Sequence, residues 1–315
     1  MSQLRRGAAR QAYSLLLAAL TPAYLFKLWW RGREEPLYRH AVPERLGRYR
    51  VSPSEGWVWV HGVSLGETRA AGSLIEALRA ELPGMRLLLT NGTATGREAG
   101  TKLLRPGDQQ VWLPYDTPGV VQRFFRQFRP RVGVLMVTGV WPNLLHGARD
   151  HGVTMVLANA RLSEKSARQA QRLESVMRPA AQVFSLVLAQ TQTDAKRLLE
   201  AGASRVEVCG NLKFDMTPAP DLLDRGHGWH AAAERPVRRT VVLAASTREG
   251  EEAPLLAGWA AQAQPRPLLL LVPRHPQRFD EVAALVREAG FTLARRSDWG
   301  DAAPPPEAHD VDVWL

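Results

Sequence analysis

Short apolar segments alternate with amphipathic segments along most of this chain, and this pattern limits its fold more than any other feature. The apolar runs have the length of strands, and the runs between them have the 3.6-residue period of helices. Such alternation is typical of βαβ units, in which helices cover a parallel sheet on both faces. The predicted strands are residues 57–61, 86–90, 110–113, 132–136, 154–158, 185–188 and 206–208, and the predicted helices are residues 68–82, 97–103, 120–128, 141–151, 164–176 and 194–201.

A second series of strands and helices follows a segment rich in proline and glycine. Residues 217–236 predict a linker between an N-terminal domain, residues 36–216, and a second domain, residues 237–315. The second domain is short for an independent unit, and the chain ends on a predicted strand. We therefore expect an incomplete second domain whose sheet has an uncovered edge. Its predicted strands are residues 240–244, 267–272 and 312–315, and its predicted helices are residues 251–263 and 278–289.

The N-terminal segment, residues 1–35, predicts a membrane anchor. The run from Tyr13 to Trp30 is mostly apolar, and arginines flank it on both sides. Its length is at the lower limit for a spanning helix, and the pair Trp29 and Trp30 suits the level of lipid headgroups. The anchor can span the membrane or lie in its interface. A helix packed in the protein core is the alternative.

The chain carries a formal net charge of +10, which favours anionic partners. No motif typical of nucleic-acid recognition is present, so a phosphorylated substrate or an anionic membrane surface is favoured over nucleic acid. The single cysteine, Cys209, excludes an internal disulfide and fits a reducing compartment. No Cys/His cluster, Walker loop or dinucleotide fingerprint predicts a metal or a cofactor.

The first predicted strand leads through a short turn into a helix, and this junction is the strongest candidate site. The turn contains Ser64 and Gly66, and it delivers the carboxylate of Glu67 to the start of the helix. Glycine lets the backbone approach a ligand closely, and free N–H groups at a helix start favour an anion. Glu67 is therefore a candidate general base, and the alternative is a glutamate that only complements the helix dipole.

Other polar residues follow later strands, where open α/β sheets bind ligands. Asn143 follows the fourth strand, and Arg161 follows the fifth, where its guanidinium is suited to an anionic acceptor. Ser163 is expected to cap a helix. Lys213 follows the seventh strand, where it either meets a phosphate or carboxylate or is simply solvated. Ser64, Gly66, Asn143, Arg161 and Lys213 are the acceptor-binding candidates.

The second domain offers a similar pair of strand ends. Ser246 and Thr247 follow one strand, and Arg274 and His275 follow the next. Hydroxyl groups beside Arg and His predict a site for a nucleotide phosphate and a carboxylate. The alternatives are helix capping by the hydroxyls and a local hydrogen bond of His275. The Asp-x-Asp sequence that ends at Asp312 is read as a strand start rather than a metal site.

In combination these motifs resemble the 3-deoxy-D-manno-octulosonic acid (Kdo) transferases, which are GT-B glycosyltransferases with two Rossmann-like domains. The matching segments are residues 61–67, 113–116, 141–143, 157–166, 210–215, 244–252 and 272–279. The resemblance implies transfer of Kdo from CMP-Kdo to a lipid A precursor at the cytoplasmic face of the bacterial inner membrane. It implies inversion at the anomeric carbon, no metal requirement, and Glu67 as the catalytic base.

Two departures from the family pattern affect the expected activity. Val137 and Gly139 stand where the family has glutamates. The sequence also stops at Leu315, before the family's Gly-Gly-x-Asn-x-x-Glu-type donor motif. We therefore expect a chain that is truncated and nearly inactive. A non-catalytic membrane lipid-binding remnant, and a GT-B glycosyltransferase with another nucleotide-sugar donor, remain as alternatives.

Overall fold

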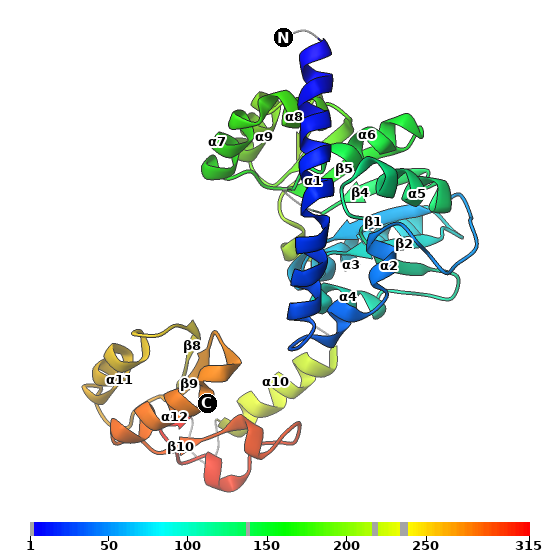
Figure 1. Cartoon of the computed structure of the whole chain (residues 1–315). Helices are drawn as coiled ribbons and strands as arrows, with labels where there is room; N and C mark the ends of the chain where they lie inside the picture. Colours follow the sequence, from blue (N-terminus) through cyan, green and yellow to red (C-terminus); the bar gives the residue numbers. More distant parts are fainter. Residues whose placement is uncertain (1–2, 137–138, 216–219, 234–238) are drawn as a thin grey trace. The chain divides into compact units, whose positions relative to one another are not determined.

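The chain forms two compact α/β units, Met1–Met216 and Thr217–Leu315. The computed structural model describes residues 3–136, 139–215, 220–233 and 239–315 (Figure 1). Each unit is built on a sheet whose strands are all parallel. The expected class, two parallel α/β units preceded by an apolar helix, is confirmed.

The first unit contains a seven-stranded sheet in the order β3-β2-β1-β4-β5-β6-β7. The strand order reverses between β1 and β4, which pair from Val58 opposite Val132 to His61 opposite Leu135. All seven strands expected from the sequence are present. They are β1 Val58–Gly62, β2 Leu87–Asn91, β3 Gln109–Trp112, β4 Val132–Leu135, β5 Thr154–Ala160, β6 Phe184–Ala189 and β7 Val206–Val208.

Successive side chains of the central strands enter two separate cores, one on each face of the sheet. Trp59 packs with the phenylalanines of α5 on one face, while Val60 packs with Ile75 of α3 on the other. This follows from the two-residue period of a strand, and it leaves β1 and β2 fully buried. The helices after β1 are α3 Leu65–Glu81, α4 Ala94–Thr101, α5 Pro118–Phe128, α6 Pro142–Asp150, α7 Glu164–Arg172, α8 Glu174–Ala181 and α9 Gln192–Glu200.

One local expectation was wrong within this unit. The helix expected over residues 164–176 is divided into α7 and α8, because Leu173 leaves the helical conformation at φ −113° and ψ 28°. The stretch between α1 and β1 contains the short helices η1 Pro36–Arg39 and α2 Val42–Arg45.

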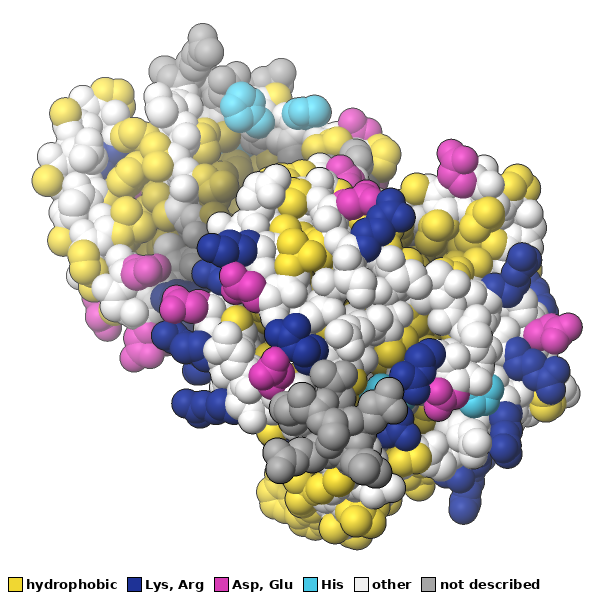
Figure 2. Space-filling model, turned by 90° about the horizontal axis from the view of Figure 1, so that it is seen from above, with side chains coloured by type: hydrophobic (Ala, Val, Ile, Leu, Met, Phe, Trp, Pro, Cys, Tyr) yellow, Lys and Arg dark blue, Asp and Glu magenta, His cyan; other side chains and the backbone are white. Residues whose placement is uncertain are grey.

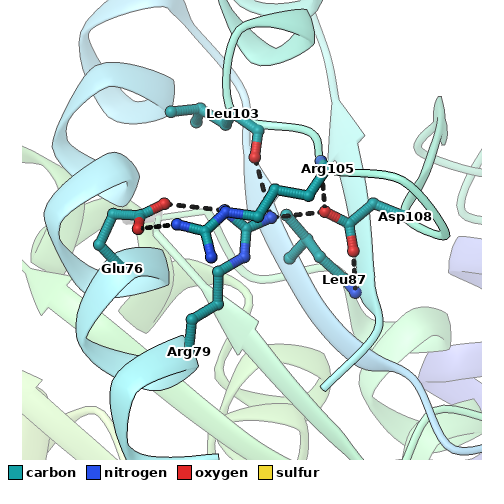
Figure 3. A network of polar contacts seen from close by, with 6 residues as sticks. All are labelled: Glu76, Arg79, Leu87, Leu103, Arg105 and Asp108. Carbon is teal, nitrogen blue, oxygen red and sulfur yellow. Dashed lines mark hydrogen bonds and ion pairs between the residues drawn. The ribbon is translucent and has the colours of Figure 1, made fainter. Parts of the chain in front are cut away.

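Helix α3 is fixed to the sheet by a network of ion pairs at its C-terminal half (Figure 3). Arg79 bonds Glu76 at 2.8 Å and Asp108 at 2.5 Å, and Asp108 also accepts the N–H of Leu87 at 2.8 Å. The side chains of Arg79 and Asp108 are nearly buried, so solvent screens their pair only weakly. The network holds the far end of the helix whose first turn carries Glu67.

The apolar N-terminal segment forms one long helix, α1 Gln3–Arg31, which runs along the side of the first unit (Figure 1). The hydroxyl of Tyr13 donates to Asp116 at 2.8 Å, and the ring of Tyr24 stacks on Tyr115 with centroids 4.4 Å apart. Leu28 is buried. One side of this helix is therefore packed against the unit, as the core-packing alternative requires.

The other side of α1 is apolar and exposed. By length and composition the segment Gly7–Arg31 could cross a membrane. Because the docked side is held by polar contacts to the unit, the structure favours a helix lying against the protein over one leaving it. The large apolar side chains exposed on this helix are Leu15, Leu16, Leu20, Phe26, Trp29 and Trp30.

The second unit contains a four-stranded sheet in the order β10-β11-β9-β8. The terminal strand β11 pairs on both sides, with β9 and with β10, so the expected uncovered edge at the last strand is wrong. The reason is β10, a two-residue strand that is too short to be recognised from the sequence pattern. The elements are β8 Val241–Thr247, α11 Glu252–Ala260, β9 Leu268–Pro273, η3 Pro276–Arg278, α12 Phe279–Glu288, β10 Leu293–Ala294, η4 Arg296–Asp298, η5 Pro306–Ala308 and β11 Val313–Trp314.

The segment expected to be a linker contains a helix. Helix α10 spans Pro220–Ala233 inside the expected range 217–236. Its last residue, Ala233, is buried in a cluster with Leu268 and Trp314 of the second unit. The proline at its start is tolerated because the first N–H groups of a helix need no intrahelical partner.

Candidate active site

Glu67 lies at the point where the strand order of the first sheet reverses. Strand β1 ends at Gly62, and Glu67 stands in the first turn of the helix that follows. The neighbouring strand β4 ends at Leu135 on the same edge of the sheet. In open α/β sheets, ligands bind outside the carboxyl ends of the strands at such a reversal.

The carboxylate of Glu67 closes a capping box with Ser64. Its Oε2 accepts the N–H groups of Val63 at 2.8 Å and Ser64 at 3.0 Å. Ser64 has extended backbone at φ −108°, and its Oγ accepts the N–H of Glu67 at 3.5 Å. Both expectations for Glu67 are therefore compatible, because the helix start holds one carboxylate oxygen while Oε1 receives no hydrogen bond from a described residue.

The turn that carries Glu67 is held by hydrogen bonds and by close packing on its protein side, and it is exposed to solvent at Gly66. The amide Nδ2 of Asn91 donates to the carbonyl of Gly62 at 3.0 Å and to the hydroxyl of Thr68 at 2.9 Å. A Cβ at Gly96 would lie 2.9 Å from the carbonyl oxygen of Val63, so only glycine lets α4 approach the turn. Gly66 is exposed, and a Cβ there would meet nothing within 4 Å.

His61 is a buried neutral base that the sequence did not single out. Burial lowers its pKa to about 4, although the hydrogen bond to Thr90 opposes this shift. Its Nδ1 lies 2.9 Å from the carbonyl oxygen of Thr90, and its ring packs edge-on against Trp141 at 5.2 Å. His61 begins the motif that ends at Glu67, and this was the available signal. The residue positions β1 against the segment that leads into α6.

Asn143 is committed to internal hydrogen bonds rather than exposed to a ligand. It is buried, its Nδ2 donates to the carbonyl of Asp116 at 2.7 Å, and its Oδ1 accepts the hydroxyl of Ser14 at 3.1 Å. Asp116 in turn accepts the N–H of Leu144 at 2.7 Å, which caps α6 from another segment. Burial raises the pKa of Asp116 to about 7, and the hydrogen bond from Tyr13 is the largest opposing effect.

Arg161 and Lys213 are brought to the same edge of the sheet as Glu67. Arg161 is exposed just beyond β5, and its guanidinium bonds to no described residue. Lys213 lies on the short helix η2 Leu212–Asp215, which packs against α3. This helix is held by Asn159, whose Oδ1 accepts the N–H of Leu212 at 3.2 Å.

The two positions that lack the family glutamates follow β4 at this edge. Val137 lies outside the described residues. Gly139 is described, and a Cβ there would lie 3.3 Å from the ring of Trp141. Ser163 accepts the N–H of Ser166 at 3.2 Å, as expected of a helix cap.

The donor candidates of the second unit lie together at the ends of two paired strands. Thr247 pairs with Pro273, and the N–H of Arg274 donates to the carbonyl of Thr247 at 2.8 Å. Ser246 has a positive φ of 60°, which is rare for a residue with a side chain. Helix capping does not explain these hydroxyls, because Glu251 occupies the cap position of α11. His275, Arg274 and Ser246 are exposed.

A buried ion pair below these strand ends escaped the sequence reasoning. Glu252, 1% exposed, receives two hydrogen bonds from Arg278 at 2.8 and 3.1 Å. Burial favours a higher pKa of Glu252, but the bonds from Arg278 outweigh it and hold the pKa below its usual value. The pair joins α11 to the loop after β9. The only earlier signal was that both residues fall in segments resembling the family.

Two further sequence expectations concern ions and charge. Across the described ranges, no group of three His, Cys, Asp or Glu side chains is placed to hold a metal ion. Asp312 accepts the N–H and the hydroxyl of Thr292 at 3.0 and 2.7 Å, which fits a strand start. On the face shown in Figure 2, basic side chains are interspersed with acidic ones rather than gathered in one patch.

Comparisons with known proteins agree with these features. A family profile for 3-deoxy-D-manno-octulosonic-acid transferase (kdotransferase) matches residues 40–216. A 3-deoxy-D-manno-octulosonic acid transferase of Bordetella pertussis is 45% identical, covering 97% of this chain and 72% of the relative. The enzyme of that name from Haemophilus influenzae is 32% identical, with coverages of 90% and 68%.

Among solved structures, the UDP-GlcNAc 2-epimerase of Neisseria meningitidis bound to UDP-GlcNAc is similar over 74% of this chain and 69% of its own, at 14% identity and a TM-score of 0.49. The family profile covers the part of the first unit that contains Glu67, and it does not include α1. The chain belongs to the Kdo transferase family of glycosyltransferases.

Proposed function

We propose that this chain transfers Kdo from CMP-Kdo to a lipid A precursor in lipopolysaccharide synthesis, with inversion at the anomeric carbon. This departs from the near-inactivity expected from the sequence, and a transfer assay decides between the two. The observation that carries the proposal is Glu67, a carboxylate at the strand-order reversal with one oxygen held by two backbone N–H groups. A fixed carboxylate at the ligand-binding edge of the sheet is suited to accept the proton of a sugar hydroxyl.

The proposed reaction balances without a metal. The acceptor hydroxyl gives its proton to Glu67 while its oxygen forms the new bond to the anomeric carbon. The bond from that carbon to the phosphate of CMP breaks, and CMP leaves with the electron pair. Arg161 and Lys213 supply positive charge for an anionic acceptor, with Ser64 and Gly66 in the turn beside Glu67.

The second unit is proposed to hold the donor. Ser246 and Thr247 end one strand and Arg274 and His275 end its neighbour, so hydroxyl and cationic groups are available for a phosphate and a carboxylate. The positive φ of Ser246 is the kind of backbone strain that is retained at functional sites. Asn143, although buried, positions α6 at the acceptor edge through its bonds with Asp116.

The exposed side of α1 is proposed to hold the protein at the cytoplasmic face of the inner membrane. Leu15 is 71% exposed and Phe26 is 61% exposed, and both lie on the side of the helix away from the unit. Trp29 and Trp30 are suited to the headgroup level, and the net charge of +10 favours anionic lipid. The helix would then lie in the interface and present a lipid acceptor to the unit.

A non-catalytic lipid-binding protein is the second candidate, because Val137 and Gly139 replace family glutamates. The deciding experiment incubates the full chain with CMP-Kdo and a tetra-acylated lipid A precursor, and measures product by mass spectrometry and CMP binding by calorimetry. Transfer of Kdo supports the proposal. CMP binding without transfer, or no CMP binding at all, supports the second candidate. Transfer from a different nucleotide sugar would overturn the assignment of the donor.

A further inference from the structure

The first unit contains a large cavity of which the proposed reaction uses only Arg161. It has a volume of about 680 Å³ and lies between the sheet and the helices α7, α8 and α9. Leu157, Phe184 and Val187 of the sheet form its floor, and Met177 and Leu198 line its walls. Small-molecule sites commonly have volumes of ~300–1,000 Å³ and mostly apolar linings.

Helix α7 lies over the cavity, and none of its residues is buried. It lines the cavity with the small side chains of Ala167 and Ala170 and with the polar side chains of Ser166, Gln169 and Gln171. The lining is mostly apolar, so an apolar occupant would gain dispersion contacts with it.

One end of the cavity carries a positive charge available to a ligand. Gly139 and Arg161 form this end, at the carboxyl ends of β4 and β5. Most other cations of the lining are already engaged: Arg178 bonds Glu174 at 2.7 Å, and Arg197 bonds the carbonyl of Leu162 at 3.2 Å. The guanidinium of Arg161 bonds to no described residue, so an anionic group at this end would find a partner there.

We propose that this cavity binds an acyl chain of the lipid acceptor, with Arg161 contacting an anionic group at its mouth. The inference rests on the proposed function for the identity of the lipid. Strands β1, β4 and β5 are neighbours, so Arg161 follows a strand roughly 10 Å from the one that precedes Glu67, at ~4.8 Å per strand. A lipid held by its chain in the cavity thus keeps its polar end at the edge that carries Glu67.

The binding test uses the full chain and two probes below their micelle-forming concentrations. Cis-parinaric acid, a fluorescent fatty acid, reports chain binding, and dodecyl phosphate displaces it. Ala170→Trp fills the cavity from α7 and is expected to weaken probe binding at least tenfold. Lys165→Trp, on the same helix but outside the lining, is the control and should bind normally. Equal binding by both variants would overturn the proposal.

The charge at the mouth is tested separately. Arg161→Ala should weaken the binding of dodecyl phosphate by about 1.4-fold to fivefold, the usual range for an exposed ion pair, and leave the binding of dodecanol unchanged. Arg168→Ala removes an exposed arginine that pairs with Glu164 outside the cavity. It should change the binding of neither dodecyl phosphate nor dodecanol. If Arg161→Ala lowers the affinity for dodecyl phosphate and for dodecanol equally, Arg161 does not contact the anionic headgroup.

A kinetic comparison separates this inference from the proposed function. Ala170→Trp should raise KM for the acylated acceptor, and leave kcat and the KM of a deacylated acceptor unchanged. If Ala170→Trp blocks probe binding but the unmodified chain transfers no Kdo, the lipid cavity is supported and the proposed function is refuted. Normal transfer with unchanged KM would refute the cavity alone.

Discussion

Glu67 caps α3 and is proposed as the general base, and two substitutions separate these roles. Glu67→Ala removes both N–H···O bonds, at 2.8 and 3.0 Å, to the partly exposed groups of Val63 and Ser64. Water can replace part of this interaction, so we expect a loss of about 1–2 kcal/mol in the free energy of unfolding. For a unit of this size that corresponds to a Tm lower by about 2–8 °C.

Glu67→Gln should keep the fold and lose the chemistry. The amide oxygen of Gln can still accept the two N–H groups, and Gln is a normal partner in a capping box. The amide cannot take the proton of the acceptor hydroxyl, so turnover should fall ~10²–10⁴-fold. Thermal unfolding and Kdo transfer would be measured on both variants.

A matched capping variant controls for stability. Thr191→Ala removes the cap of α9, whose Oγ1 accepts the N–H of Asp194 at 3.1 Å, at the end of a different strand. It should lower Tm in the same range as Glu67→Ala and leave turnover unchanged. If Glu67→Gln transfers Kdo at the rate of the unmodified chain, Glu67 is a helix cap only and the base must be another group.

Three further outcomes are expected. The folded-state pKa of Asp116 is about 7, above its ordinary 3.8, so the unfolded chain loses this proton at a lower pH than the folded chain. The stability that the protonated carboxyl of Asp116 contributes is therefore fully present below about pH 3.8 and is lost as the pH rises to about 7. Asp116→Asn should flatten the change in the free energy of unfolding over this pH range, measured by urea unfolding. Phe26→Glu combined with Trp30→Glu should weaken binding to anionic vesicles about tenfold or more in flotation assays with unchanged Tm, whereas Leu199→Glu, an exposed leucine on α9, should bind as before. Glu252→Gln should lower the Tm of the second unit because Arg278 loses its buried counter-charge. The Tm difference between the unmodified chain and this variant should vanish as the pH falls through the lowered pKa of Glu252. Equal Tm values at pH 7 would refute this role.

Local sequence patterns determined most of the secondary structure and the positions of the strand ends. The strands are four to seven residues in the central part of the sheet, and their apolar character is visible without knowledge of any neighbour. Ser64 followed three residues later by Glu67 also predicts a helix start on its own. Strand β10 escaped notice because it has only two residues. Helix α10 escaped notice because its sequence contains proline and glycine, which usually indicate a linker.

The tertiary structure alone decided which strand ends meet. The sequence gives no sign that β1 lies beside β4, because pairing depends on the crossing of helices over both faces of the sheet. That order brings Arg161 to the edge that carries Glu67. The tertiary structure also decided how α1 lies. The hydrogen bond from Tyr13 to Asp116 joins residues 103 positions apart, and such long-range contacts dock one side of the apolar helix on the unit and leave its other side exposed. An apolar periodicity shows that a helix has a face to bury, and only the packing of the whole unit determines whether protein or lipid covers it.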